Sequence, residues 1–138
     1  MNEIRFGIVG TNTITEKILE AAKEEPRFKL AAVYSRTQER ADAFAAKHNI
    51  PHTYTSLEEM AASPSIDAVY IASPNILHAP QSILCMNHGK HVLCEKPIAS
   101  DAENARKMIE TAKKNKVVLM EAMKPTLTPN FLSIMESI

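Results

Sequence analysis

The residues in this sequence that could do chemistry lie in short polar stretches, each placed after a mostly apolar run. One of them, Glu95-Lys96-Pro97, comes directly after residues 91–94. A lysine at the end of a central strand points its ammonium group into a cleft, where it can orient or polarise a carbonyl or hydroxyl group. Pro97 fixes the turn, and a bond before proline is where a cis peptide can form. The tripeptide alone also fits a solvated lysine in an ordinary strand-to-helix turn.

A second polar stretch separates residues 4–9 from residues 14–22. The first segment is apolar and suits a buried strand, whereas the apolar residues of the second recur at helical spacing. A turn from a strand into a helix presents free backbone N–H groups and the positive end of the helix dipole to a phosphate. In the dinucleotide-binding pattern G-x-G-x-x-G/A, Gly10 takes the first position, but Asn12 and Thr15 take the other two. The Asn12 amide can donate to a phosphate oxygen, yet an ordinary capped turn fits these residues equally well.

The third stretch, Ser35-Arg36, follows the apolar run 28–34. A dinucleotide-binding domain usually places an acidic residue there, where it binds the ribose 2′-hydroxyl of NAD. An arginine can instead pair with the 2′-phosphate of NADP and stack on adenine, and Ser35 can donate to that phosphate. We therefore expect NADP as the cofactor, with NAD still possible. The alternative is that Arg36 is a solvated surface arginine.

The rest of the chain predicts a scaffold that brings these stretches together. Runs that suit strands alternate with segments that suit helices almost without exception. The expected strands are residues 4–9, 28–34, 52–54, 67–72, 91–94 and 117–120, and the expected helices are 14–22, 37–47, 56–60, 79–87 and 100–115. Thr37, Ser56 and Ser100 are expected to cap three of these helices. The pattern is typical of a three-layer α/β/α fold with a doubly wound, mostly parallel sheet.

In such a sheet, ligands bind beyond the carboxyl ends of the strands, where the strand order reverses. The residues just past each expected strand are therefore the candidate site. They are Thr11, Asn12, Ser35, Arg36, Ser73, Pro74, Asn75, Glu95, Lys96, Pro97 and Glu121.

Composition narrows the function classes. A chain of 138 residues suits one domain. Its sixteen basic and sixteen acidic residues cancel, which argues against a nucleic-acid partner held by bulk charge. No apolar run approaches the ~20 residues of a membrane span, and the N-terminus lacks a signal peptide's apolar core. Cys85 and Cys94 are expected as free thiols in the cytoplasm, and the scattered histidines predict no metal site.

Taken together, the polar stretches resemble the glucose–fructose oxidoreductase/inositol dehydrogenase family of NAD(P)-dependent oxidoreductases. The resemblance rests on GIVGTNTIT (7–15), VYSR (33–36), SPNILH (73–78), GKHVLCEKP (89–97), Glu121-Ala122 and Pro129. It covers essentially the whole chain, in order and at family-like spacing. Two departures stand out. Asn12 replaces the usual second glycine, and Lys124-Pro125-Thr126 stands where many members have an aromatic residue and an arginine.

This resemblance implies a Rossmann dinucleotide-binding domain over residues 1–123, with the cofactor pyrophosphate on the first turn. It implies that Lys96 is the catalytic residue, close to the nicotinamide and the substrate. Without the resemblance, His78 would be interpreted as a cap-region histidine. The residues assigned to the cofactor are Gly10, Thr11, Asn12, Thr13, Ile14, Ser35, Arg36, Ser73, Pro74, Asn75, His78, Glu95, Lys96 and Glu121.

Family members also carry a second domain that closes over the nicotinamide and supplies further acid–base residues. Residues 124–138 are interpreted as the start of the connection to that domain, with an apolar helix face over 131–138. The family implies a homo-oligomer when the second domain is present.

Two functions follow from this interpretation. The first is hydride transfer between NADP(H) and a carbohydrate-like substrate, a sugar- or polyol-like alcohol or ketone. The alternative is a non-catalytic dinucleotide-binding module that senses cofactor or scaffolds a partner. Lys96 favours the enzyme, because a sensor has no need for a lysine in the cleft.

Overall fold

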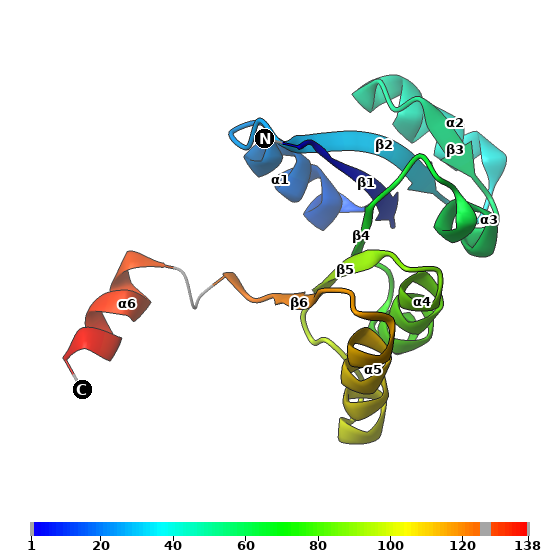
Figure 1. The fold of residues 1–138 in the computed structure, drawn as a ribbon. Coiled ribbons are helices and arrows are strands. Elements are labelled where there is room, and N and C mark those ends of the chain that lie inside the picture. Colours follow the sequence, from blue (N-terminus) through cyan, green and yellow to red (C-terminus); the bar gives the residue numbers. More distant parts are fainter. Residues whose placement is uncertain (1, 125–127, 138) are drawn as a thin grey trace.

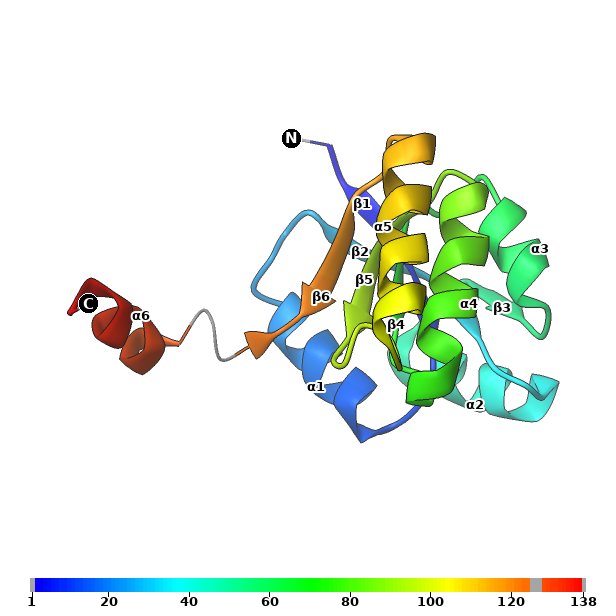
Figure 2. The same cartoon turned by 90° about the horizontal axis from the view of Figure 1, so that it is seen from below.

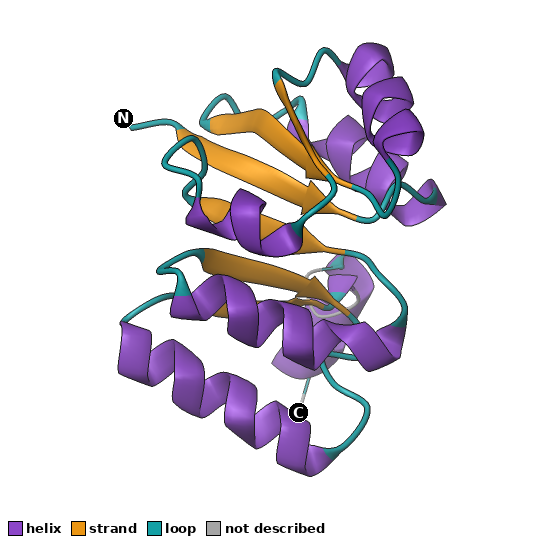
Figure 3. Ribbon diagram, turned by 90° about the vertical axis from the view of Figure 1, so that its right-hand side faces the viewer, coloured by secondary structure: helices purple, strands orange, loops and turns teal. Residues whose placement is uncertain are grey.

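The computed structural model describes residues 2–124 and 128–137, and a six-stranded parallel sheet forms the centre of this part of the chain. The strand order is β3-β2-β1-β4-β5-β6, and every neighbouring pair is parallel (Figure 3). The order reverses between β1 and β4, which confirms the predicted doubly wound α/β fold. The strands are β1 (Ile4–Val9), β2 (Phe28–Tyr34), β3 (His52–Tyr54), β4 (Ala68–Ile71), β5 (His91–Glu95) and β6 (Leu119–Ala122).

Helices follow the strands in alternation along the described chain. They are α1 (Thr13–Ala22), α2 (Gln38–His48), α3 (Leu57–Ala62), α4 (Asn75–Asn87), α5 (Ala102–Asn115) and α6 (Pro129–Glu136). Thr37 and Ser56 cap α2 and α3 as predicted, because their hydroxyl oxygens accept the backbone N–H of Arg40 and Glu59. Figure 2 shows α4 and α5 packed side by side.

Two apolar clusters, one on each face of the sheet, join the three layers. On one face, Val9, Val69 and Ile71 pack with buried residues of α3, α4 and α5. On the other face, Ile8, Val33 and Tyr70 pack with Leu19 of α1 and with residues of α2. Successive residues of β1 and β4 enter opposite clusters, because side chains alternate along a strand. The central strands are therefore buried on both faces, which fixes the positions of their carboxyl ends.

Several elements differ from the predicted boundaries by one or two residues, and α4 differs by four. Helix α4 begins at Asn75 rather than Ala79 and so includes Pro80, whose missing N–H removes one helical hydrogen bond. Helix α5 is capped by Asp101 rather than Ser100, because the Asp101 carboxylate accepts the Asn104 N–H at 2.8 Å. Strand β6 begins two residues later than predicted. The residue before it, Val118, donates its N–H to His91 Nδ1 at 2.9 Å.

The C-terminal helix α6 lies apart from the sheet and its helices (Figure 1). None of its residues is buried. The predicted apolar face of this helix is exposed: the exposed fractions of Phe131, Leu132, Ile134 and Met135 are 37–60%. Pro125, Thr126 and Ile138, which the sequence patterns included, lie outside the described residues.

Candidate functional site

The carboxyl ends of the strands border two hollows of about 300 Å³ each. Asn12, Ala72 and Ser73 line both, so the hollows adjoin at the point where the strand order reverses. The first hollow is also lined by Val9, Gly10, Thr11, Tyr34, Ser35, Arg36, Arg40, Pro74, Leu77 and Gln81. The second is also lined by Ile14, Asn75, His78, Glu95 and Lys96. Most of the residues assigned to the cofactor are thus brought together, whereas Thr13 and Glu121 line neither hollow.

Gly10 is required where β1 turns toward α1. Its φ of +104° is one that L side chains rarely adopt. A Cβ atom at Gly10 would lie 2.6 Å from the carbonyl oxygen of Ala72. The turn therefore lies directly against the end of β4, and this close approach, together with the positive φ, requires a glycine.

Asn12 and Thr15 hold this turn by side-chain hydrogen bonds rather than by being small. Asn12 Oδ1 accepts the N–H groups of Ile14 and Thr15 at 3.1 and 3.2 Å and so caps α1. Its amide nitrogen donates to Ala72 O at 2.6 Å, so the amide is engaged within the protein. Thr15 is buried, and its hydroxyl donates to Gly10 O at 2.8 Å. The backbone N–H groups of Thr11 and Thr13 donate to no described residue, which leaves them available to an anion.

Two arginines stand at the outer end of the first hollow. Arg36 follows β2 as predicted, and Arg40 lies one helical turn further on in α2. Neither guanidinium group forms an ion pair within the described residues, whereas Arg5 and Arg27 are both paired with carboxylates. No carboxylate lines this hollow. Together with the nearly buried Ser35, the two arginines fit an anionic group such as a ribose 2′-phosphate.

The second hollow holds a buried carboxylate beside an exposed ammonium group. Glu95 ends β5 and is only 6% exposed. The hydroxyl of Tyr70, on the neighbouring strand β4, donates to Glu95 Oε1 at 2.7 Å. Burial, together with this bond, raises the pKa of Tyr70, so the hydroxyl remains a donor. Lys96 follows on the exposed side and lines the same hollow, as its position after the strand predicted.

His78 joins the two turns that border the second hollow. It is 1% exposed, and its two ring nitrogens lie 2.7 Å from Pro97 O and 2.8 Å from Ser73 O. The Lys96–Pro97 bond is cis, the geometry that the sequence allowed for. Because both nitrogens face backbone carbonyls, His78 supports the frame of the hollow through the turns after β4 and β5.

Glu121 lies within β6, whereas the sequence placed it just past the strand. Its side chain points to the face opposite Met120 and Ala122, because neighbouring strand residues alternate. There Glu121 Oε1 accepts the N–H of Ile98 at 2.8 Å. The carboxylate thereby holds the loop that follows Lys96-Pro97.

Sequence reasoning missed several residues of the first hollow: Tyr34, Arg40, Leu77 and Gln81. Arg40 had a usable signal, since it lies in the first turn of the helix that follows Arg36, close to the end of β2. Gln81 had none, because its place depends on the early start of α4. There its Oε1 accepts the Ser73 hydroxyl at 2.6 Å.

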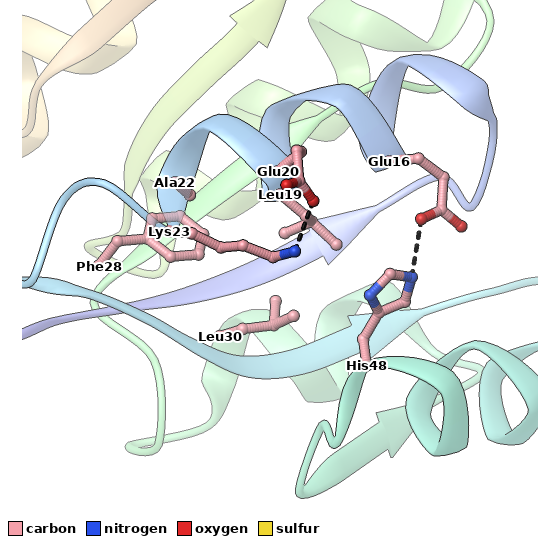
Figure 4. Close-up of a pocket in the computed structure, with 8 residues that line it drawn as sticks. All are labelled: Glu16, Leu19, Glu20, Ala22, Lys23, Phe28, Leu30 and His48. Atoms are coloured by element: carbon pink, nitrogen blue, oxygen red, sulfur yellow. Dashed lines mark hydrogen bonds and ion pairs between the residues drawn. The ribbon is translucent and has the colours of Figure 1, made fainter.

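A third hollow, of about 260 Å³, lies between α1, β2 and the end of α2 (Figure 4). Leu19, Phe28 and Leu30 form its apolar wall. Glu16 pairs with Lys47 at 2.7 Å and contacts His48 at 2.9 Å, and Glu20 pairs with Lys23. None of the candidate residues singled out from the sequence lines this hollow, so the candidate site is the strand edge.

The described residues contain no group of three metal-ligating side chains and no helix long and apolar enough to cross a membrane. Cys85 and Cys94 are both free and buried. Burial raises the pKa of the Cys94 thiol to about 11, which makes it a poor nucleophile.

Comparison with known proteins gives a family match over most of the chain. The model of an oxidoreductase family, described as having an NAD-binding Rossmann fold, matches residues 4–123. The chain is 62% identical over 128 residues to scyllo-inositol 2-dehydrogenase (NADP(+)) of Bacillus subtilis (strain 168). The matched region covers 93% of this chain and 39% of that enzyme. It is 37% identical over 115 residues to 1,5-anhydro-D-fructose reductase of Ensifer adhaerens, covering 83% of this chain and 34% of the reductase.

A solved structure extends the likeness to three dimensions. The 3-ketoreductase KijD10 from Actinomadura kijaniata, crystallised with TDP-benzene and NADP, superposes with a TM-score of 0.90 at 29% identity. The superposition covers 98% of this chain and 43% of the ketoreductase. The chain thus spans about two fifths of the length of the relatives it matches.

Proposed function

Because this chain belongs to the oxidoreductase family with an NAD-binding Rossmann fold, we propose that it binds NADP(H) across the two hollows. It would form the cofactor-binding part of an enzyme that transfers a hydride between NADP(H) and a sugar- or polyol-like alcohol or ketone. The names of its relatives, a polyol dehydrogenase and a sugar reductase, support this substrate class.

One observation carries the proposal for the cofactor. Arg36 and Arg40 present guanidinium groups without carboxylate partners among the described residues, at the end of β2 where NAD-binding domains place an acid. A carboxylate there would repel a 2′-phosphate, whereas two arginines attract it. The Gly10 turn and the free N–H groups at the start of α1 would hold the pyrophosphate.

Bound NADP(H) supplies the hydride or accepts it, and the remaining chemistry falls to side chains. Lys96 is exposed and unpaired within the described residues, so its ammonium group is free to donate to a substrate oxygen and to stabilise charge that develops there. This position favours an enzyme over a sensor module. His78 and Glu121 keep the Lys96–Pro97 turn in place from two sides.

We also propose the larger context of the domain. Residues 1–123 would form the dinucleotide-binding domain, and 124–138 would begin the connection to a second domain that completes the active site and forms a homo-oligomer. The exposed apolar side chains of α6 support this role. The two free, buried thiols are in keeping with a protein of the reducing cytoplasm.

Cofactor titration of arginine variants tests the proposal. Arg36→Ala removes a charged hydrogen-bond partner and should weaken NADPH binding by ~1.5–3 kcal/mol, while NADH binding hardly changes because NADH lacks the 2′-phosphate. Arg40→Ala should act in the same direction. Arg106→Ala, an exposed arginine on α5, is the matched control. Equal losses for NADPH and NADH in the Arg36 variant would contradict the assignment.

A further inference from the structure

Glu95 combines deep burial with the lack of a cationic partner. It is 6% exposed, yet no lysine, arginine or histidine forms an ion pair with it among the described residues. Its protein contacts are the Tyr70 hydroxyl at 2.7 Å and the Lys96 backbone N–H at 3.3 Å. A buried carboxylate normally has a charge partner or several strong donors. The Glu95 carboxylate can therefore interact further with a ligand that enters the second hollow.

The contacts also fix which oxygen remains available. Tyr70, fully buried on β4, holds Oε1 with a short bond. Oε2 accepts a single long bond from the following residue. Glu95 itself lines the hollow together with Lys96. The carboxylate is thus held in place by the sheet through Oε1, and Oε2 keeps the greater capacity to accept a further hydrogen bond.

We propose that Glu95, positioned by Tyr70, biases the site toward the oxidised form of the cofactor. The inference rests on the proposed function, because it takes the second hollow as the nicotinamide side of the site. The oxidised ring carries a positive charge that the reduced ring lacks, so only the oxidised form is attracted to a carboxylate. A carboxylate that water hardly reaches exerts this attraction in a low effective dielectric.

Lys96 opposes this bias only weakly. Its ammonium group is at the end of a flexible side chain and is exposed, so water and ions screen its field. Glu95, by contrast, is the only carboxylate that lines the second hollow in the described structure. The two side chains therefore have different roles. Glu95 discriminates between the two forms of the cofactor, and Lys96 remains free to donate to a substrate oxygen.

The test is the ratio of the dissociation constants of NADP+ and NADPH. NADPH binding is followed by its fluorescence, and NADP+ binding by displacement of NADPH. Glu95→Gln keeps the size of the side chain and an oxygen for Tyr70, and it should shift the ratio against NADP+ by about tenfold, the scale of one removed charge at short range. Glu103→Gln, on the exposed surface of α5, makes the same change in net charge and should leave the ratio unchanged.

Two further variants keep the inference testable if the Glu95→Gln variant does not fold. Tyr70→Phe retains the carboxylate charge, so the preference for NADP+ should persist. Lys96→Met removes an exposed, screened charge, and the ratio should move toward NADP+ by much less than it moves away in Glu95→Gln. Equal weakening of both cofactor forms by Glu95→Gln, or loss of the preference for NADP+ in Tyr70→Phe, would overturn this inference alone. Failure of the unmodified protein to bind either form would overturn the proposed function as well.

Discussion

Replacing Gly10 by alanine tests whether the turn after β1 is fixed by steric contact with β4. The alanine would have to adopt a φ of +104°, which costs about 1–3 kcal/mol for a residue with a Cβ atom. The new Cβ would also lie 2.6 Å from Ala72 O and 2.9 Å from Ala72 C. Relief of that overlap requires the turn to move away from β4, and overpacking of this kind costs a further ~1–3 kcal/mol.

The expected loss is therefore about 4 kcal/mol, a large part of the ~5–15 kcal/mol by which domains are stable. Gly89 offers a matched control. Its φ is +74°, but a Cβ there would meet nothing within 4 Å. Gly89→Ala should thus cost only about 1 kcal/mol, for the backbone conformation alone. The difference between the two variants isolates the contact between the turn and β4.

Urea unfolding followed by circular dichroism measures both free energies of unfolding. NADPH titration of the Gly10 variant should show weakened binding as well, because the displaced turn presents its N–H groups in the wrong place. If Gly10→Ala unfolds at the same urea concentration as Gly89→Ala and binds NADPH normally, the steric argument is wrong.

Two further predictions concern Lys96, the proposed catalytic residue, and Asp67, which has a structural role. In a protein that carries this chain with a complete active site, Lys96→Met should lower turnover by about 10²–10⁴-fold. The affinity for NADPH should change little. Turnover within about threefold of normal would show that Lys96 is only a structural residue of the turn. Asp67 pairs with Arg5 at 2.6 Å, and the Arg5 hydrogen bonds lower its pKa from 3.8 to about 2. Its stabilisation is present above pH ~4 and lost as the pH falls toward 2. Asp67→Asn should therefore cost about 1 kcal/mol or less at pH 7, given its exposure, and a smaller amount at pH 2, where the carboxyl is partly protonated. A cost that stays constant in urea melts across that range would refute the pairing.

The fold was predictable because its signals are local. Buried strands such as β1 and β4 are short apolar runs, and hydroxyl residues such as Thr37 cap helices by contacts three residues away. The same holds for the position of the site, since the edge of a parallel sheet follows from the strand ends. Lys96 and Arg36 could be placed at that edge without knowledge of any side-chain contact.

The roles of individual side chains were less predictable, because they depend on contacts distant in sequence. The Asn12 amide reaches Ala72, sixty residues away, and Tyr70 reaches Glu95 on the neighbouring strand, 25 residues away. Glu121 lies inside β6, which ends two residues later than predicted, and its carboxylate accepts the N–H of Ile98, 23 residues away. No local pattern encodes a contact of this kind.

Direct titration of the unmodified chain with NADPH and with NADH tests whether the two hollows bind a dinucleotide and whether Arg36 and Arg40 bind its 2′-phosphate. Both cofactors share every group except that phosphate. If Arg36 and Arg40 bind the 2′-phosphate, NADPH binds at least about tenfold tighter than NADH, the equivalent of one charged contact. Equal affinity for the two, or tighter binding of NADH, would contradict this role of Arg36 and Arg40.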